Sequence, residues 1–241
     1  MAGIESKVKE IKQSFRLMMD GATAQSMRQK GLDYRLNWGA TIPRLHEMAD
    51  KIANSLQCID DDDGAQPNYS EFTKKYELSI ALWKENVREC KILATMLMPP
   101  EQMLPEVADI WMEQTPTLEI AEQAAFNLYQ HLPYAADKAF EWIASASDLS
   151  QICGYHIFSR LFMRGQELNE RGINEFLDQV LTALSASGAR DCPPPGSRVS
   201  PSFTTALQKA AMQAVVRFAD LSIMHRRLAL SATRSIGMSF L

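Results

Sequence analysis

LSIALWKENVRECKILATMLM, from Leu78 to Met98, is the stretch that decides the fold. Its apolar residues recur at steps of three and four, which places them on one face of a helix. Pro99 and Pro100 end this helix, because proline lacks an N–H group and restricts the residue before it. A second apolar stripe begins within residues 101–112, so the two segments predict a helical hairpin with one face to bury.

Segments with the same apolar spacing continue on both sides of this hairpin, and no segment alternates in the manner of a strand. The hairpins begin near Leu78, Thr117, Leu149 and Phe203, at intervals that bracket the roughly 40-residue period of HEAT repeats. A helix pair cannot bury its own apolar face, whereas stacked pairs form a continuous core. The sequence therefore predicts an all-α fold, a HEAT/ARM-like α-α superhelix with a concave inner surface. We expect the other helices over 4–19, 22–30, 41–56, 117–131, 134–146, 149–164, 169–187, 203–221 and 224–236.

The pattern predicts one HEAT-like repeat domain over residues 1–241. Its N-terminal part, 1–77, is helical but irregular and contains an acidic loop at Asp60 to Asp63. The repeats proper occupy 78–241 and are interrupted by a proline-rich loop at 188–201, because three successive prolines cannot be helical.

The composition is typical of a soluble globular protein, with 46% hydrophobic and 22% charged residues. No apolar run approaches the roughly 18–20 residues that span a bilayer, and the N-terminus lacks the apolar core of a secretion signal. The four cysteines are far apart, as is usual in a reducing cytoplasm. We therefore expect a cytoplasmic protein with no membrane partner.

The net charge of −4 argues mildly against a general nucleic-acid binder, because phosphate contacts need clustered Lys and Arg. The charge is unevenly distributed, however. Residues 201–241 carry five basic residues and one acidic residue, a net charge of +4, which leaves −8 on the remainder. The C-terminal part can therefore present a local basic patch.

Motifs for metal or cofactor chemistry do not occur in this sequence. The four histidines lack the spacing of a zinc site, and neither GxxxxGK[ST] nor GxGxxG is present to hold phosphates. GxSxG and similar nucleophile motifs do not occur either. We therefore expect no metal and no cofactor.

WGATIPRLHEMADKI, from Trp38 to Ile52, resembles the "YG-x-x-x-P-x-L-R-x-L-A" opening of the AlkD-type DNA alkylation-repair proteins. LWKENVRECKILATMLM, from Leu82, resembles the "LW-x-x-x-x-x-E-x-R-x-L-A" helix of the same family. The later helix pairs are similar in order and spacing, so the resemblance covers roughly Ile4 to Ile236. Its motifs describe the helical scaffold more than the site.

The resemblance implies a basic concave face for duplex DNA and, in active members, release of N3- or N7-alkylated purines. In those members an aspartate lies near the sugar, two tryptophans line the cleft and an arginine contacts the backbone. Here the matching helix start, TPTLEIAEQ, has no tryptophan and offers Glu119 or Glu122 as the carboxylate. Ile152 stands at the arginine position and Gln213 at that of the second tryptophan. These departures predict weak or lost N-glycosylase activity in a divergent member.

Two functions therefore follow as alternatives from the sequence. The first is DNA binding, with Glu119 or Glu122 as the carboxylate of any remaining base excision. The second is a non-catalytic scaffold for a protein partner, which the negative net charge and the missing tryptophans favour. Both glutamates also match the acidic first turn of a helix, which the helix dipole stabilises. The first alternative predicts a basic stripe drawn from Lys84, Arg88, Arg160, Lys209, Arg217, Arg226 and Arg227.

Overall fold

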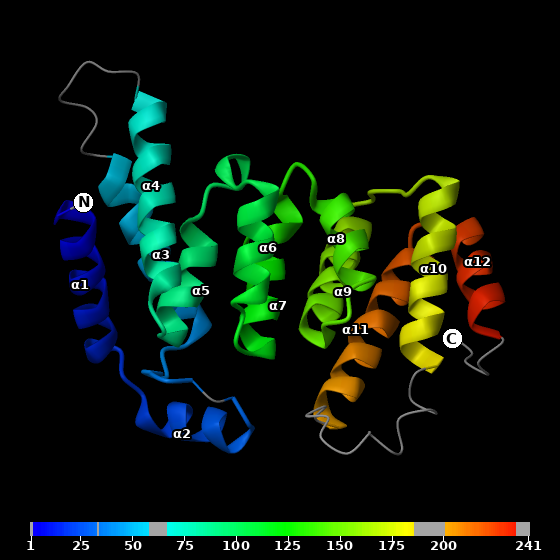
Figure 1. Ribbon diagram of the computed structural model, residues 1–241, viewed down its shortest axis with the longest axis horizontal. Helices are drawn as coiled ribbons and strands as arrows, with labels where there is room; N and C mark the ends of the chain where they lie inside the picture. The colour runs from blue at the N-terminus through cyan, green and yellow to red at the C-terminus, as the bar shows by residue number, and fades with distance from the viewer. Residues whose placement is uncertain (1, 33, 58–66, 186–200, 235–241) are drawn as a thin grey trace. The chain divides into compact units, whose positions relative to one another are not determined.

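The computed structural model describes residues 2–32, 34–57, 67–185 and 201–234, and this part of the chain is helical without a β-strand (Figure 1). The α-helices are α1 (Ala2–Leu17), α2 (Gly21–Gln29), α3 (Ile42–Gln57), α4 (Pro67–Lys84), α5 (Arg88–Leu97), α6 (Pro105–Glu113), α7 (Leu118–Asn127), α8 (Ala135–Ile143), α9 (Asp148–Met163), α10 (Glu170–Ser185), α11 (Pro201–Ala219) and α12 (Ile223–Thr233). Two short 3-10 helices, η1 (Pro100–Gln102) and η2 (Tyr129–His131), precede α6 and follow α7. The acidic loop at 60–63 and nearly all of the proline-rich loop at 188–201 lie outside the described residues.

The helix predicted over 78–98 is wrong in one respect, because it is two helices. α4 ends at Lys84 and α5 begins at Arg88, with Val87 in an extended conformation between them. The apolar spacing continues through the break between α4 and α5, so the break could not be predicted from that spacing. The freed backbone N–H of Arg88 donates instead to the carbonyl of Leu36, 3.1 Å away. The hairpin is therefore formed by α4 and α5, and these two helices pack together.

The chain forms two compact units, Met1–Pro133 and Tyr134–Leu241. In the first unit α5 is central, since it packs against α3, α4 and α7. Every residue of α5 except Met96 is buried, including the charged side chains of Arg88, Glu89 and Lys91. Trp83 and Trp111 stack with ring centroids 4.2 Å apart, and both are buried in the core of this unit.

In the second unit α9 is central and packs against α8 and α11. Gly154 permits the close approach of α8, because a Cβ atom there would lie 2.7 Å from Ile143 Cγ2 and 2.9 Å from the Ala139 carbonyl. Aromatic rings fill the space between α9, α10 and α11 in edge-to-face and stacked contacts. These rings belong to Phe158, Phe162, Phe176 and Phe218.

Both units show the same local rule of packing. Neighbouring helices pair, as α4 does with α5 and α8 with α9. The second helix of one pair then packs on the second helix of the next, as α5 does on α7 and α9 on α11. Stacked pairs of this kind are what HEAT-type repeats use to bury their apolar faces. Among the described helices none combines the length and the apolar character needed to cross a bilayer.

The start of α2 is held by a close backbone contact in the first unit. Asp20 caps α2 by accepting from the Thr23 N–H at 3.0 Å, and its own N–H donates to the Trp38 carbonyl at 2.9 Å. Gly39 follows with φ +75°, and a Cβ there would lie 2.1 Å from the Asp20 carbonyl oxygen. Position 39 therefore requires glycine for both conformation and space.

Replacing Gly39 by alanine tests this contact against a matched control at Gly31, which has φ +81° and no atom near an added Cβ. Gly31→Ala meets only the left-handed backbone cost of about 1–2 kcal/mol. Gly39→Ala adds an overlap with backbone, so we expect it to lower the free energy of unfolding by more than about 3 kcal/mol. Urea unfolding followed by circular dichroism measures both, and equal losses would contradict the contact.

Candidate functional site

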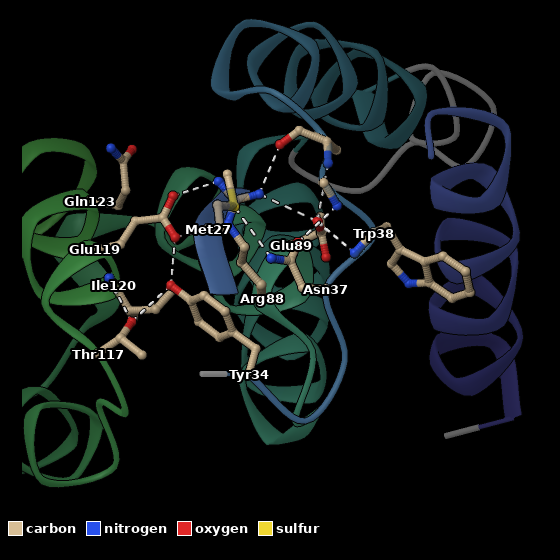
Figure 2. A network of polar contacts seen from close by, with 12 residues as sticks. Met27, Tyr34, Asn37, Trp38, Arg88, Glu89, Thr117, Glu119, Ile120 and Gln123 are labelled. Atoms are coloured by element: carbon tan, nitrogen blue, oxygen red, sulfur yellow. Dashed lines mark hydrogen bonds and ion pairs between the residues drawn. The ribbon is translucent and has the colours of Figure 1, made fainter. Parts of the chain in front are cut away.

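Three segments of the first unit meet around a buried ion pair: residues 34–40, the start of α5 and the start of α7 (Figure 2). Arg88, the first residue of α5, donates from Nε to Glu119 Oε2 at 2.8 Å and from Nη2 to Glu119 Oε1 at 2.5 Å. The pair is therefore bidentate, which is the strong geometry for arginine and carboxylate. The side chain of Arg88 is 1% exposed and that of Glu119 is 16% exposed.

The remaining nitrogen of Arg88, Nη1, is also occupied. It donates to the Ala40 carbonyl at 2.8 Å and lies 3.3 Å from Glu89 Oε1. Glu89, which is fully buried, in turn accepts from the backbone N–H groups of Trp38 at 3.1 Å and Ala40 at 3.2 Å. The network thus fixes residues 36–40 onto α5 through both side chains and backbone.

Tyr34 closes the network on the side of α7. Its hydroxyl donates to Glu119 Oε2 at 2.5 Å and lies 2.8 Å from the hydroxyl oxygen of Thr117. Because a tyrosine hydroxyl has one proton, Thr117 must donate to Tyr34 Oη. Thr117 also caps α7, since its side chain accepts from the Ile120 N–H. The helix cap and the ion pair therefore belong to one hydrogen-bonded chain.

The electrostatics favour the charged state of both ions. Burial alone would raise the pKa of Glu119, but the hydrogen bonds and charge of Arg88 outweigh it, and the pKa is lowered. Burial would likewise lower the pKa of Arg88, yet Glu119 and then Glu89 raise it. Burial and the neighbouring Glu119 charge raise the pKa of Tyr34. At neutral pH Glu119 is thus a carboxylate, Arg88 a guanidinium and Tyr34 a neutral phenol.

The two predicted carboxylates are therefore in different situations. Glu119 is held by Arg88 and Tyr34, with both oxygens accepting hydrogen bonds. Glu122 follows on α7 and is half-buried.

Arg88, predicted to contact DNA, is instead buried with every guanidinium nitrogen engaged, so this geometry leaves it no surface for a phosphate. Lys84, the last residue of α4, is exposed.

The other predicted cations lie in the second unit, where three arginines gather at the C-terminal ends of α9 and α11. Burial, together with the charges of Arg164 and Arg217, lowers the pKa of Arg160. Burial is the larger cause, and repulsion by the two like charges adds to it. Asp220 lies 3.5 Å from Arg217 Nη1 and 3.8 Å from Arg226 Nη2. Asp220 therefore faces two of these basic side chains at once.

An open hollow of about 390 Å³ lies beside this cluster. Its lining combines apolar side chains with the charged pair of Arg217 and Asp220; the other lining residues are Phe162, Met163, Gly165 and Leu221. The remaining predicted cations, Lys209 on α11 and Arg226 and Arg227 on α12, are exposed. The structure thus brings Arg160, Arg217 and Arg226 near one another, all within the second unit.

Three residues of these two clusters were not predicted from the sequence: Arg164, Tyr34 and Glu89. Arg164 stands four residues after Arg160, and that spacing on one helix face was the available signal. The involvement of Tyr34 and Glu89 had no local signal, because their partners lie far away in the chain.

The fold is similar to that of one solved structure, described as "a new family of proteins related to the HEAT-like repeat DNA glycosylases with affinity for branched DNA structures". The TM-score is 0.68, the sequence identity is 16%, and the match covers 95% of this chain and 82% of that chain. This chain has the HEAT-like repeat fold. The predicted fold class is confirmed, while no family model and no curated protein matches the sequence.

Neutralising Glu119 tests the ion pair, with Glu113→Gln at the exposed end of α6 as the control. Glu119→Gln leaves Arg88 with reduced compensation in a buried site, so we expect it to lower the free energy of unfolding by about 3 kcal/mol at pH 7. Glu113→Gln should change it by less than about 0.5 kcal/mol. Urea unfolding followed by circular dichroism provides the comparison.

The effect of Glu119→Gln should also depend on pH in a defined direction. The pKa of Glu119 is lowered on folding, so its contribution is complete above the ordinary value of 4.5 and is lost as pH falls through the lower folded value. The difference between the unaltered protein and Glu119→Gln should therefore shrink below about pH 4.5. A difference that stays constant from pH 7 to pH 3 would contradict the ionised pair.

Proposed function

We propose that this protein binds DNA, prefers branched to continuous duplex DNA, and does not use Glu119 to excise bases. The observation that carries the proposal is the arginine cluster of the second unit. The like charges of Arg164 and Arg217 act on Arg160, and Arg217 and Arg226 share the carboxylate of Asp220. A single cation at a helix C-terminus is stabilised by the helix dipole, but gathering several from two helices costs repulsion. A bound polyanion would offset that repulsion.

The hollow beside the cluster supports the preference for branched DNA. Met163, which lines it, is 53% exposed, and Ile223 and Met224, just after the lining residue Leu221, are 75% and 67% exposed. Apolar side chains of this kind can contact bases that are not fully stacked. Such bases occur at branch points and not within continuous duplex. The solved structure with a similar fold is itself described as having affinity for branched DNA.

The ion pair of Glu119 argues against base excision at this residue. A carboxylate that assists cleavage of a glycosidic bond acts by facing the positive charge that develops on the sugar. The charge of Glu119 already faces Arg88, and its two oxygens accept from Arg88 and Tyr34. A substrate could approach this carboxylate only by breaking a buried ion pair.

DNA binding is tested by fluorescence anisotropy with a labelled four-way junction and a linear duplex of matched length over a series of salt concentrations. The junction should bind more tightly. Replacing Arg160 and Arg164 together by glutamine should weaken binding and make the slope of log K against log salt less negative by about 2, since each phosphate contact contributes about 0.9.

The matched control for this pair is Lys51→Gln with Arg171→Gln, which removes two exposed cations on α3 and α10. It should leave the slope unchanged. If neither DNA binds in a salt-dependent manner, the proposal is wrong and the alternative of a scaffold for a protein partner is favoured.

Base release is tested separately with DNA that contains N7-methylguanine. We expect release at the rate of spontaneous depurination, because the negative charge of Glu119 is already paired with Arg88. Chromatography of the released base measures this rate. Enzymatic release that is abolished by replacing Glu119 and Glu122 together by glutamine would contradict the proposal and restore a catalytic carboxylate.

A further inference from the structure

The helix α2 differs from the other helices of the first unit. None of its nine residues is buried, and Figure 1 shows it lying apart from the stacked helices. Helices of globular proteins are stabilised mainly by burying an apolar face, which α2 lacks. A helix of this kind gains little free energy from packing, so we looked for a role in binding for its exposed surface.

Positive charge is concentrated around α2. Residues 16–46 contain five basic residues, Arg16, Arg28, Lys30, Arg35 and Arg44, and two acidic residues, Asp20 and Asp33. All five basic side chains are exposed. Asp20 is committed to the helix cap, since hydrogen bonds from Thr23 lower its pKa and hold its charge at the start of α2. We refer to α2 with Lys30 and Arg35 as the basic arm.

The basic arm is exposed, but the chain on either side of it is firmly attached to the unit. On one side, the Asp20 N–H donates to the Trp38 carbonyl. On the other, Tyr34 donates to Glu119, and residues 36–40 are bonded to Arg88 and Glu89 (Figure 2). A rigid base presents exposed cations with less loss of conformational freedom on binding.

We propose that the basic arm is a second DNA-contacting surface, which binds the sugar-phosphate backbone through Arg28, Lys30 and Arg35. The buried pair of Arg88 and Glu119 then acts as its support, a positioning role in place of a catalytic one. This inference rests on the proposed DNA-binding function and adds a surface in the first unit to the arginine cluster of the second.

The composition of α2 favours a nucleic-acid backbone over an apolar partner. Its sequence, GATAQSMRQ, contains one large apolar residue, Met27, whose sulfur accepts from Asn37 Nδ2 at 3.3 Å. An amphipathic helix that binds a membrane or a hydrophobic groove needs a continuous apolar face. Small and polar side chains beside exposed cations instead match the contacts that proteins make with phosphate oxygens.

The test is the salt dependence of duplex and junction binding for the triple variant Arg28→Gln, Lys30→Gln and Arg35→Gln in the full chain. These exposed side chains take no part in the buried network, so the fold should be unchanged by circular dichroism. We expect weaker binding and a slope of log K against log salt less negative by about 2 to 3. The matched control, Lys9→Gln with Lys51→Gln and Arg171→Gln, removes three exposed cations on α1, α3 and α10 and should leave the slope unchanged.

Each outcome decides the inference. If the unaltered protein binds DNA and the triple variant retains its slope, the basic arm is not a DNA contact, and the proposed function stands on the arginine cluster alone. If the triple variant and the control change the slope of log K against log salt by the same amount, the effect is one of net charge and the inference is wrong. If the unaltered protein does not bind DNA, both proposals fail.

Discussion

The bidentate pair of Arg88 and Glu119 is the interaction on which the first unit depends. It joins α5 to α7, and through Glu89 and Tyr34 it also fixes residues 34–40. Removing two charges from water is costly, and only well-oriented hydrogen bonds offset that cost. Every nitrogen of the guanidinium and both oxygens of Glu119 have such bonds here. The arrangement is therefore stable only as a complete set, which explains why one network involves a helix start, a helix cap and a loop backbone.

The helical fold could be predicted from the sequence because it follows from local rules. Apolar residues at steps of three and four placed the helices from α6 to α11 close to their observed bounds. The break before Arg88 could not be predicted in this way, because Val87 continues the apolar stripe. Its cause is a hydrogen bond to Leu36, a contact between distant parts of the chain.

Less of the candidate site could be predicted from the sequence, because its contacts also join distant parts of the chain. Glu119 was predicted from the sequence as a candidate catalytic carboxylate, but its surroundings depend on Arg88 and Tyr34, which no spacing rule connects to it. Arg88 was predicted as part of a basic stripe for DNA, whereas its side chain is 1% exposed. Conversely, the basic residues around α2 were visible in the composition and were overlooked, since the C-terminal residues carried a larger excess of charge. Local patterns predicted where the helices are, whereas the charge pairs join residues that are distant in the sequence and became visible only in the structure.

The burial of this ion pair also bears on how such a protein can change over generations. Substituting either Arg88 or Glu119 alone leaves the other ion buried without its partner, so the intermediate sequence is penalised whichever position mutates first. The two positions are thereby constrained to vary together. One buried contact in this way links the mutational histories of two residues that stand 31 positions apart.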